Sequence, residues 1–265
     1  HRKHLSTTTY KSRGFKVVRC ENCRLAQKFC ICELAPIHQL IDRNKLDNSS
    51  AQQAGFLLLM YDTEILKPSN TGRLIADLVP DTFAFLWSRT EENPELLTVL
   101  ADEQWQPFVV FPAQYAQEGR QVIQDKVVCE PGKRPLFILL DGSWREAKKM
   151  FRKSPYLAKF PMVSFDPTKH LPFASANDAS ASDPEQVSEH NLTSRYHMRI
   201  ASGENQFGTA EVAARVLSMA GEQEMANVLD LWFDVFSYQY QKSVCQKNKG
   251  NPQAIEQYLN YIKTL

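Results

Sequence analysis

The sequence predicts an α/β fold with a mainly parallel sheet. Five short, continuous apolar runs are spaced along residues 56–165, as is typical of strands covered on both faces. Stretches with helical character separate these runs, which indicates repeated βα units. In the last third of the chain, apolar residues recur at spacings of three and four, which predicts amphipathic helices.

The elements follow in order along the chain. The predicted strands are Phe56–Tyr61, Phe83–Trp87, Phe108–Phe111, Leu136–Leu140 and Met162–Phe165. The predicted helices are Thr71–Val79, Pro94–Asp102, Ser143–Lys153, a long one over 225–240 and a short one over 255–262. The 265 residues, 43% hydrophobic, are enough for one large domain or two modest ones.

We expect four segments. Residues 1–19 form a basic flexible arm, 20–50 a cysteine module, 51–220 the α/β domain, and 221–265 C-terminal helices that pack on it. A long polar loop over 171–191 is either a lid over a site or a solvent-exposed loop that has no role at a site.

Charge is balanced overall, with 31 Lys and Arg against 30 Asp and Glu, but it is segregated. The first 20 residues and the stretch 144–159 are basic, whereas 62–102 is acidic, and such segregation can hide a nucleic-acid face behind a neutral total. No apolar run is long enough to cross a membrane, and residues 1–20 lack the apolar core of a secretory signal. We therefore expect a cytoplasmic protein with no membrane partner.

Four cysteines, Cys20, Cys23, Cys30 and Cys32, fall within 13 residues. The first pair has the C-x2-C spacing that places two thiolates at adjacent corners of a Zn²⁺ tetrahedron. Four protein ligands would close the site, which predicts a structural zinc ion. Free thiols and an iron–sulfur cluster remain the alternatives, although the ferredoxin spacing is absent.

Asp141-Gly142-Ser143-Trp144 directly follows a predicted buried strand and opens a helix. Ser143 and Glu146 form a capping box, which predicts a helix start at about Trp144. Ligands of open α/β sheets bind outside the carboxyl ends of strands, where Asp141 would lie. The alternative is that Asp141 only caps or pairs with a cation. The following helix is basic. Its basic side chains either form an ordinary solvent-exposed face or contact phosphates, and they are Arg145, Lys148, Lys149, Arg152 and Lys153.

Three further sequence strings are each weak evidence for a functional site when taken alone. Asn70-Thr71-Gly72-Arg73 joins a predicted strand to a predicted helix. Polar residues and a glycine at a helix N-terminus can form a pocket that binds an anion. Ser194-x-Tyr196-x-x-Arg199 follows the long loop, and in Thr209-Ala210-Glu211 we expect Thr209 as an N-cap. Glycine-rich nucleotide loops, the G-x-S-x-G elbow and H-E-x-x-H are absent from the sequence, which disfavours dehydrogenases, NTPases and hydrolases.

Together these strings resemble the DTW-domain family, specifically the bacterial tRNA-uridine aminocarboxypropyltransferases. The D-x-T-W motif of the family matches Asp141–Trp144, its S-x-Y-x-x-R matches Ser194–Arg199, and its T-A-E matches Thr209–Glu211. The cysteine cluster, Asn70–Arg73 and the runs at 88–90, 109–113 and 149–157 also resemble the bacterial branch. Ser143 replaces the threonine of the family but keeps its hydroxyl, and Gly208 stands where serine is frequent.

The resemblance implies transfer of the 3-amino-3-carboxypropyl group of S-adenosylmethionine (SAM) to N3 of a tRNA uridine, with position 47 expected. It also implies a fold similar to the SPOUT class, with a C-terminal trefoil knot. Asp141 is the expected base, with Ser143 and Trp144 beside it; Arg199 or Arg73 would pair with the SAM carboxylate and Glu211 with its ammonium. The implied SAM-binding residues are Asn70, Thr71, Gly72, Arg73, Pro112, Leu140, Ser194, Tyr196, Arg199, Thr209 and Glu211.

Two alternatives stay open at this point. One is a SAM-dependent RNA methyltransferase of the same fold class, and the other is a non-catalytic, zinc-containing RNA-binding protein. The expected partner is tRNA in every case, no obligate protein partner is evident, and the sequence does not decide between a monomer and a homodimer.

Overall fold

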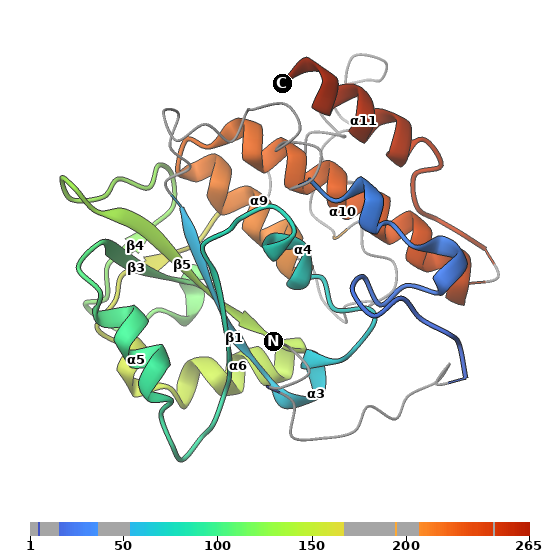
Figure 1. Cartoon of the computed structure of the whole chain (residues 1–265). Helices are drawn as coiled ribbons and strands as arrows, with labels where there is room; N and C mark the ends of the chain where they lie inside the picture. Colours follow the sequence, from blue (N-terminus) through green and yellow to red (C-terminus); the bar gives the residue numbers. More distant parts are fainter. Residues whose placement is uncertain (1–4, 6–15, 37–53, 167–193, 195–206, 246) are drawn as a thin grey trace.

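One six-stranded sheet lies at the centre of the molecule, in the order β2-β1-β5-β3-β6-β4, and all its neighbouring strands are parallel (Figure 1). The strands are β1 (Gly55–Met60), β2 (Thr82–Leu86), β3 (Trp105–Val110), β4 (Val122–Ile123), β5 (Arg134–Asp141) and β6 (Met162–Val163). The predicted parallel α/β sheet is therefore confirmed, and all five predicted strands are present. The two-residue strand β4 was not predicted, because two residues carry no apolar run.

The computed structural model describes residues 5, 16–36, 54–166, 194, 207–245 and 247–265. Most of the predicted basic arm and the whole 171–191 loop lie outside the described residues. So do 195–206, which precede the C-terminal helices. The expected trefoil knot therefore stays a prediction.

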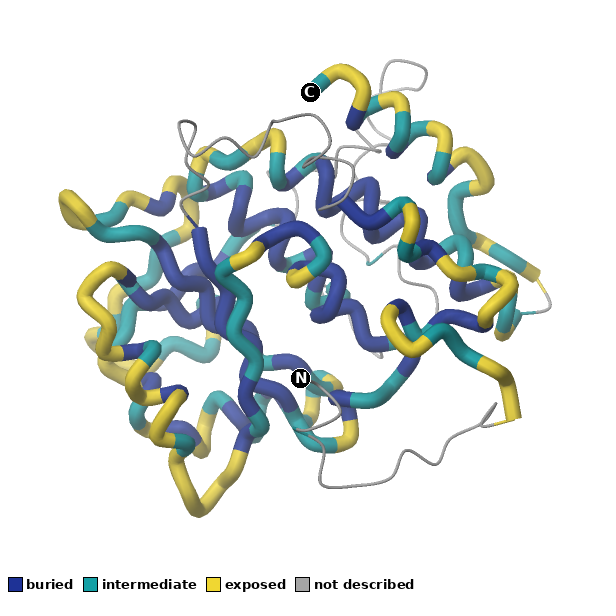
Figure 2. Tube along the Cα trace, viewed as in Figure 1, coloured by how far each residue is buried: buried dark blue, intermediate teal, exposed yellow. Residues whose placement is uncertain are grey.

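Alternate residues of the central strands face two separate cores. Phe56 and Leu58 of β1 pack toward the C-terminal helices, whereas Leu57 and Leu59 pack toward α5 (Pro94–Ala101) and α6 (Trp144–Arg152). All six residues of β1 are buried (Figure 2). Burial on both faces explains why these strands read as continuous apolar runs rather than as alternating patterns.

The C-terminal helices cover one face of the sheet. They are α9 (Thr209–Met219), α10 (Gln223–Val244) and α11 (Ala254–Thr264). Trp232, Phe233 and Phe236 of α10 are at most 1% exposed, and Trp232 packs against Tyr258 of α11. The two helices predicted from apolar spacing over 225–240 and 255–262 are thus confirmed, with slightly wider bounds.

The cysteine module packs on the same helices (Figure 1). Its short 3-10 turns are η1 (Gln27–Phe29) and η2 (Cys32–Leu34). Leu25 and Ile31 belong to the same buried cluster as Phe236 and Tyr258, and the Tyr258 hydroxyl donates a 2.8 Å hydrogen bond to the Leu34 carbonyl. In the described part of the chain, this module, the sheet and the helices share one apolar core.

The helix predicted over 71–79 is much shorter in the structure, where α4 covers Arg73–Ala76. The amides of Leu78 and Val79 both donate to the Ile75 carbonyl, so the chain tightens into a turn before Pro80. Asn70 and Thr71 stay outside the helix and make tertiary contacts instead. Several short elements were not predicted, among them the single turn α3 (Asp62–Ile65) and the 3-10 turns η3 (Ala113–Tyr115) and η4 (Pro155–Leu157).

None of the helices in the described ranges combines the length and apolarity needed to span a bilayer.

Candidate functional site

The centre of the sheet contains a topological switch point between β1 and β5. The chain leaves β1 toward β2 by way of α3 and α4, on the face of the C-terminal helices. It leaves the neighbouring strand β5 in the opposite direction, toward β6, by way of α6 on the other face. Ligands of open α/β sheets bind in the crevice that such diverging connections create.

Asp141 is the last residue of β5 and lies at this switch point. Its side chain is buried, with 1% exposure, and both of its oxygens accept hydrogen bonds. Asn70 donates through Nδ2 to Oδ2 at 2.7 Å, and the hydroxyl of Thr209 donates to Oδ1, also at 2.7 Å. Three strings that are distant in the sequence thus meet at one carboxylate.

The loop before α4 approaches Asp141 so closely that only glycine fits at position 72. A Cβ atom placed on Gly72 would lie 2.8 Å from Asp141 Oδ2 and 3.4 Å from Asn70 Oδ1. Thr71, next to it, accepts a 3.3 Å hydrogen bond from the Ala210 amide at the start of α9. The absence of a side chain at Gly72 therefore permits the Asn70–Asp141 contact.

The prediction that Thr209 caps α9 is wrong, because the N-cap is Gly208. The Gly208 amide donates a 2.7 Å hydrogen bond to Glu211 Oε2, which is the backbone half of a capping box. This shift frees the Thr209 hydroxyl for Asp141. Glu211 is fully buried, and Oε2 also accepts from the Ser194 hydroxyl, so it joins the S-x-Y-x-x-R string to α9.

The predicted start of α6 is confirmed at Trp144. The amide and hydroxyl of Ser143 both donate to Glu146 Oε2, at 2.8 and 2.6 Å, and Thr63 of α3 donates to Oε1 at 3.1 Å. Burial raises the pKa of Glu146, but these hydrogen bonds and the charge of Lys67 outweigh it and lower the pKa below its ordinary value. The amide and the hydroxyl of Ser143 therefore both serve to cap α6 through hydrogen bonds to Glu146.

Trp144 belongs to an aromatic wall at the carboxyl end of β3. Its ring stacks on Phe111 with centroids 5.5 Å apart, and Tyr115 meets it edge-on at 5.8 Å. Phe151 of α6 stacks on Phe111 at 4.4 Å. Trp144 is half-buried, and Lys148 lies 5.6 Å from the centroid of its ring. The wall fixes the orientation of the indole.

The basic residues of α6 and of its C-cap, Lys153, divide into two groups. Arg145, Arg152 and Lys153 are exposed, whereas Lys148 and Lys149 are half-buried against aromatic rings. Lys149 donates to the Tyr61 hydroxyl at 3.2 Å and lies over the rings of Tyr61 and Trp87. The predicted phosphate-contacting residues therefore do not form a single solvent-exposed face, because Lys148 and Lys149 pack against aromatic rings.

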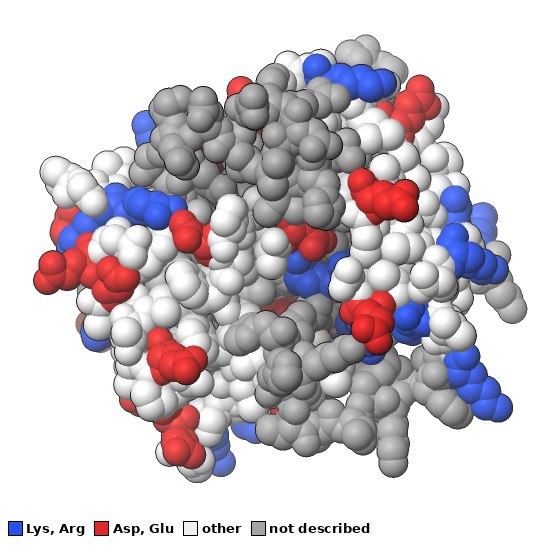
Figure 3. Space-filling view, in the orientation of Figure 1, with Lys and Arg blue, Asp and Glu red and all other residues white. Residues whose placement is uncertain are grey.

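The remaining predicted residues have different positions. Leu140 is half-buried on β5 beside Asp141, and Pro112 is half-buried just after β3. Tyr196 and Arg199 lie outside the described residues. The side chain of Arg73 is directed to α10, with its guanidinium carbon 4.8 Å from the centroid of Phe236. Figure 3 shows charged side chains of both signs gathered near the centre of the face in view.

Sequence reasoning missed Tyr61 and Phe111. Tyr61 follows β1 directly, and its amide donates to the Asp141 carbonyl at 2.9 Å, while its ring stacks on Trp87. Phe111 follows β3 directly and is the centre of the aromatic wall. An aromatic residue at the carboxyl end of a predicted buried strand is the available signal, but each position fits the last residue of its strand equally well.

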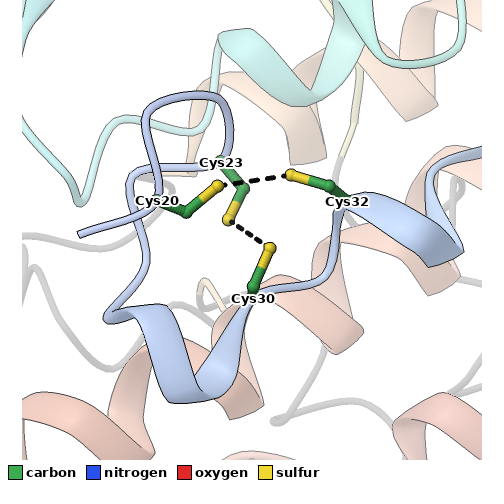
Figure 4. Close-up of side chains that lie close together, drawn as sticks. All are labelled: Cys20, Cys23, Cys30 and Cys32. Carbon is green, nitrogen blue, oxygen red and sulfur yellow. Dashed lines mark hydrogen bonds between the residues drawn. The ribbon is translucent and has the colours of Figure 1, made fainter.

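The four cysteines of the N-terminal module form one cluster (Figure 4). The sulfurs of Cys20 and Cys32 are 3.6 Å apart, those of Cys23 and Cys30 are 3.8 Å apart, and all four lie within 4.8 Å of one another. A tetrahedral zinc ion with Zn–S bonds of 2.3 Å requires sulfur–sulfur separations of about 3.8 Å. The four cysteines could therefore hold a zinc ion with little movement.

The turn that carries Cys20 and Cys23 is fixed by its backbone. The Arg24 amide donates to the Cys20 carbonyl at 3.0 Å, and the Cys20 amide donates to Leu25 at 2.9 Å. Closing this turn places Arg24 at φ 61°, which costs a residue other than glycine about 1–2 kcal/mol. A ligand that holds the four sulfurs together would offset this strain.

Burial raises the pKa of the Cys23 thiol, while the Ile31 and Leu25 amides and the charge of Arg73 act in the opposite direction. The pKa of Cys20 falls to about 7, because hydrogen bonds from the Cys23 and Asn22 amides and the neighbouring thiols outweigh the effect of burial.

The sequence matches the family model of the DTW domain over residues 17–241. No solved structure matches the chain. The matched range contains the cysteine cluster, the switch-point residues Asn70, Asp141 and Thr209, and the basic helix α6. The chain therefore belongs to the DTW-domain family.

Proposed function

We propose that this protein transfers the 3-amino-3-carboxypropyl group of SAM to N3 of a uridine in tRNA, with position 47 of the variable loop as the expected site. Membership of the DTW-domain family is consistent with a tRNA-modifying role. The observation that carries the proposal is the convergence of Asn70, Gly72 and Thr209 on the buried carboxylate of Asp141 at the switch point.

The reaction requires a base and exact placement of two substrates. Uridine N3 loses its proton and forms a bond to the methylene carbon next to sulfur, while the carbon–sulfur bond breaks and its electron pair neutralises the sulfonium. The products are N3-substituted uridine and methylthioadenosine. The leaving group is already activated, so orientation supplies much of the rate.

Asp141 is the best-placed base for the N3 proton. The hydrogen bonds from Asn70 and Thr209, one on each oxygen, fix the plane of the carboxylate at the strand end. A carboxylate held in this way at the switch point is positioned to act as a general base toward a substrate bound there. Pairing of Glu211 with the SAM ammonium remains part of the proposal.

We further propose that tRNA phosphates contact the exposed basic residues of α6 and its C-cap. Arg145, Arg152 and Lys153 are exposed and close in sequence to Asp141. Phosphate contacts by lysine and arginine release counterions, so tRNA binding should weaken with salt. Arg152→Gln and Lys153→Gln should each reduce the slope of log affinity against log salt by about 1. Lys263→Gln, at an exposed position of α11, is the matched control.

The test is to incubate the purified protein with unmodified tRNA and SAM and to analyse the nucleosides by mass spectrometry. We expect an aminocarboxypropyl adduct on uridine, and a loss of product with Asp141→Asn at unchanged thermal stability. Asp125→Asn, at an exposed turn, is the control for loss of one carboxylate.

The other outcomes separate the alternatives. A methyl adduct would identify a methyltransferase and contradict the proposed transfer. Binding of tRNA without any adduct, unaffected by SAM or by Asp141→Asn, would favour a zinc-containing RNA-binding protein. Near-normal turnover of Asp141→Asn would remove Asp141 from the role of base.

A further inference from the structure

Two lysines and two aromatic rings meet where the cysteine module packs on the C-terminal half of α10. The contact is made by η1 of the module, which lies against α10 (Figure 1). The Lys242 ammonium lies 4.4 Å from the centroid of the Tyr238 ring and 6.0 Å from that of Phe29. The Lys28 ammonium lies 4.9 Å from the same Phe29 ring. Both lysines are exposed and both rings are half-buried, so two distant parts of the chain form one surface.

The chain around this contact is basic. Residues 235–255 contain three lysines and no acid, and in residues 16–36 four basic residues outnumber two acids. We call the following six residues the module–α10 patch: Lys28, Phe29, Tyr238, Lys242, Lys247 and Lys249. Figure 3 shows lysine and arginine side chains along the right-hand edge of the face in view, where Figure 1 places the module and the end of α10.

The lysines of the patch keep their charge without a protein carboxylate. In the part of the chain that the structure describes, none of the four forms an ion pair, whereas Lys67 and Lys133 pair with glutamates at 2.6 and 2.7 Å. A cation–π contact orients an ammonium group but does not neutralise it. Exposed charges of one sign that are gathered in this way produce a field that attracts a polyanion.

We propose that the module–α10 patch binds the phosphate backbone of tRNA, as a second contact region in addition to α6. This inference rests on the function proposed above, because it takes tRNA as the partner. α10 packs on one face of the sheet and α6 on the other, and Asp141 ends the strand between them. Contacts on both faces would hold the RNA on two sides of the switch point.

α10 also connects the patch to the loop that contacts Asp141. Trp232 of α10 donates a 3.0 Å hydrogen bond to Asp77, the C-cap of α4, and α4 begins directly after Gly72. Lys242 lies about 15 Å farther along the helix axis than Trp232, at about 1.5 Å per residue. That length corresponds to about five base pairs of a duplex, at roughly 3 Å of rise per pair. One RNA stem is therefore long enough to contact the patch and approach the switch point.

The competing partner for a basic surface is an anionic membrane. Residues 1–20, which lead directly into the module, hold six Lys and Arg and no acid, and such a segment suits either polyanion. Stable attachment to a membrane surface also requires an inserting face of large apolar side chains. The rings of Phe29 and Tyr238 are half-buried and carry lysines, so they do not form such a face. Charge without an inserting face favours RNA.

The test measures the affinity of the full-length protein for unmodified tRNA, without SAM, by fluorescence anisotropy over a range of salt concentrations. Each phosphate contact contributes about 1 to the slope of log affinity against log salt. We expect the double variant Lys28→Gln/Lys242→Gln to reduce this slope by about 2. Lys247→Gln/Lys249→Gln, in the turn after α10, should have a similar effect.

A matched double variant controls for the loss of two charges. Lys126→Gln/Lys263→Gln removes two exposed lysines outside the patch and should leave the slope unchanged. Combination of the patch variants with Arg152→Gln of α6 should add their effects, because distant sites act independently. In the transfer assay, the patch variants should raise KM for tRNA and leave kcat unchanged. A lowered kcat at unchanged KM would contradict a role in binding.

The outcomes separate this proposal from the proposed reaction. Wild-type slopes in both patch variants, at unchanged melting temperature, would overturn the proposal and leave the reaction intact. Failure of the wild type to bind tRNA would overturn it as well. If no adduct forms but the patch variants still reduce tRNA binding, the reaction fails and the patch stands.

Two further measurements cover the remaining cases. Vesicles of phosphatidylcholine and phosphatidylglycerol test the membrane: loss of vesicle binding with wild-type tRNA slopes would assign the patch to lipid and overturn the proposal. If a patch variant failed to fold, ultraviolet cross-linking of the wild type to tRNA would decide. Peptides that contain Phe29 or Tyr238 should then carry RNA adducts, and their absence would overturn the proposal.

Discussion

The hydroxyl of Thr209 donates a 2.7 Å hydrogen bond to Oδ1 of Asp141, across 68 residues of sequence. This bond links the first residue of α9 to the last residue of β5, and it exists because Gly208 rather than Thr209 caps the helix. Together with Asn70 on Oδ2, it leaves the carboxylate with one defined orientation.

Thr209→Val tests this bond with little change in side-chain volume. A buried carboxylate that loses one of its donors should cost about 1.5–3 kcal/mol of stability, measured by urea unfolding. We also expect slower transfer to tRNA at saturating SAM, because the carboxylate is less well held. Thr98→Val removes a local hydroxyl contact on exposed α5 and should leave the rate unchanged. A wild-type rate in Thr209→Val would exclude Thr209 from positioning Asp141.

Gly72→Ala should disrupt the site while leaving the sheet intact. Its Cβ would lie 2.8 Å from Asp141 Oδ2, so the loop or the carboxylate has to move. A displacement of about 1 Å at a reacting group can lower a rate by about 10²-fold. Gly132→Ala is the control, because its methyl group meets nothing within 4 Å and only the φ of +81° is strained. Single-turnover kinetics and circular dichroism of both variants would check the expectation; equal rates would refute it.

The lowered pKa of Glu146 makes part of the stability dependent on pH. Burial alone would raise this pKa, but the hydrogen bonds from Ser143 and Thr63 hold it below the ordinary value of 4.5. The folded state therefore favours the ionised form, and this contribution is present above pH 4.5 and lost as the pH falls through the folded-state pKa. Glu146→Gln should show a smaller loss of stability on acidification. Parallel urea curves at neutral and acidic pH would measure it, and an unchanged pH dependence would contradict it.

Metal removal should expose the cysteines selectively. In zinc-loaded protein, a thiol reagent should modify Cys129 and Cys245 and spare the four clustered cysteines, whereas all six should react after chelation. Chelation should also lower the melting temperature, because the module shares its core with α10 and α11. Cys30→Ser should reproduce that loss in the presence of zinc, and Cys129→Ser should not. Six reactive thiols in protein as purified with zinc would show that the cluster holds no metal.

Much of the fold was predictable because its signals are local. Burial on both sides produced continuous apolar runs for β1 and β5, and apolar spacing predicted α10 and α11. The helix expected over 71–79 shrank to Arg73–Ala76 because Thr71 makes a tertiary hydrogen bond at its start and the chain tightens into a turn before Pro80 at its end. Local propensity contains no information about such distant partners.

The sequence by itself determined the residue chemistry: four cysteines at ligand spacing, a carboxylate at the end of a buried strand, and the motifs of one family. Only the tertiary structure decided which of these residues meet. Strand order placed β1 beside β5, which brought Gly72 to Asp141, and the packing of α9 on the sheet brought Thr209 to the same carboxylate, while Arg73 packs on Phe236. Spacing along the chain fixes contacts within one turn or helix, whereas contacts across 68 residues depend on how the sheet is assembled.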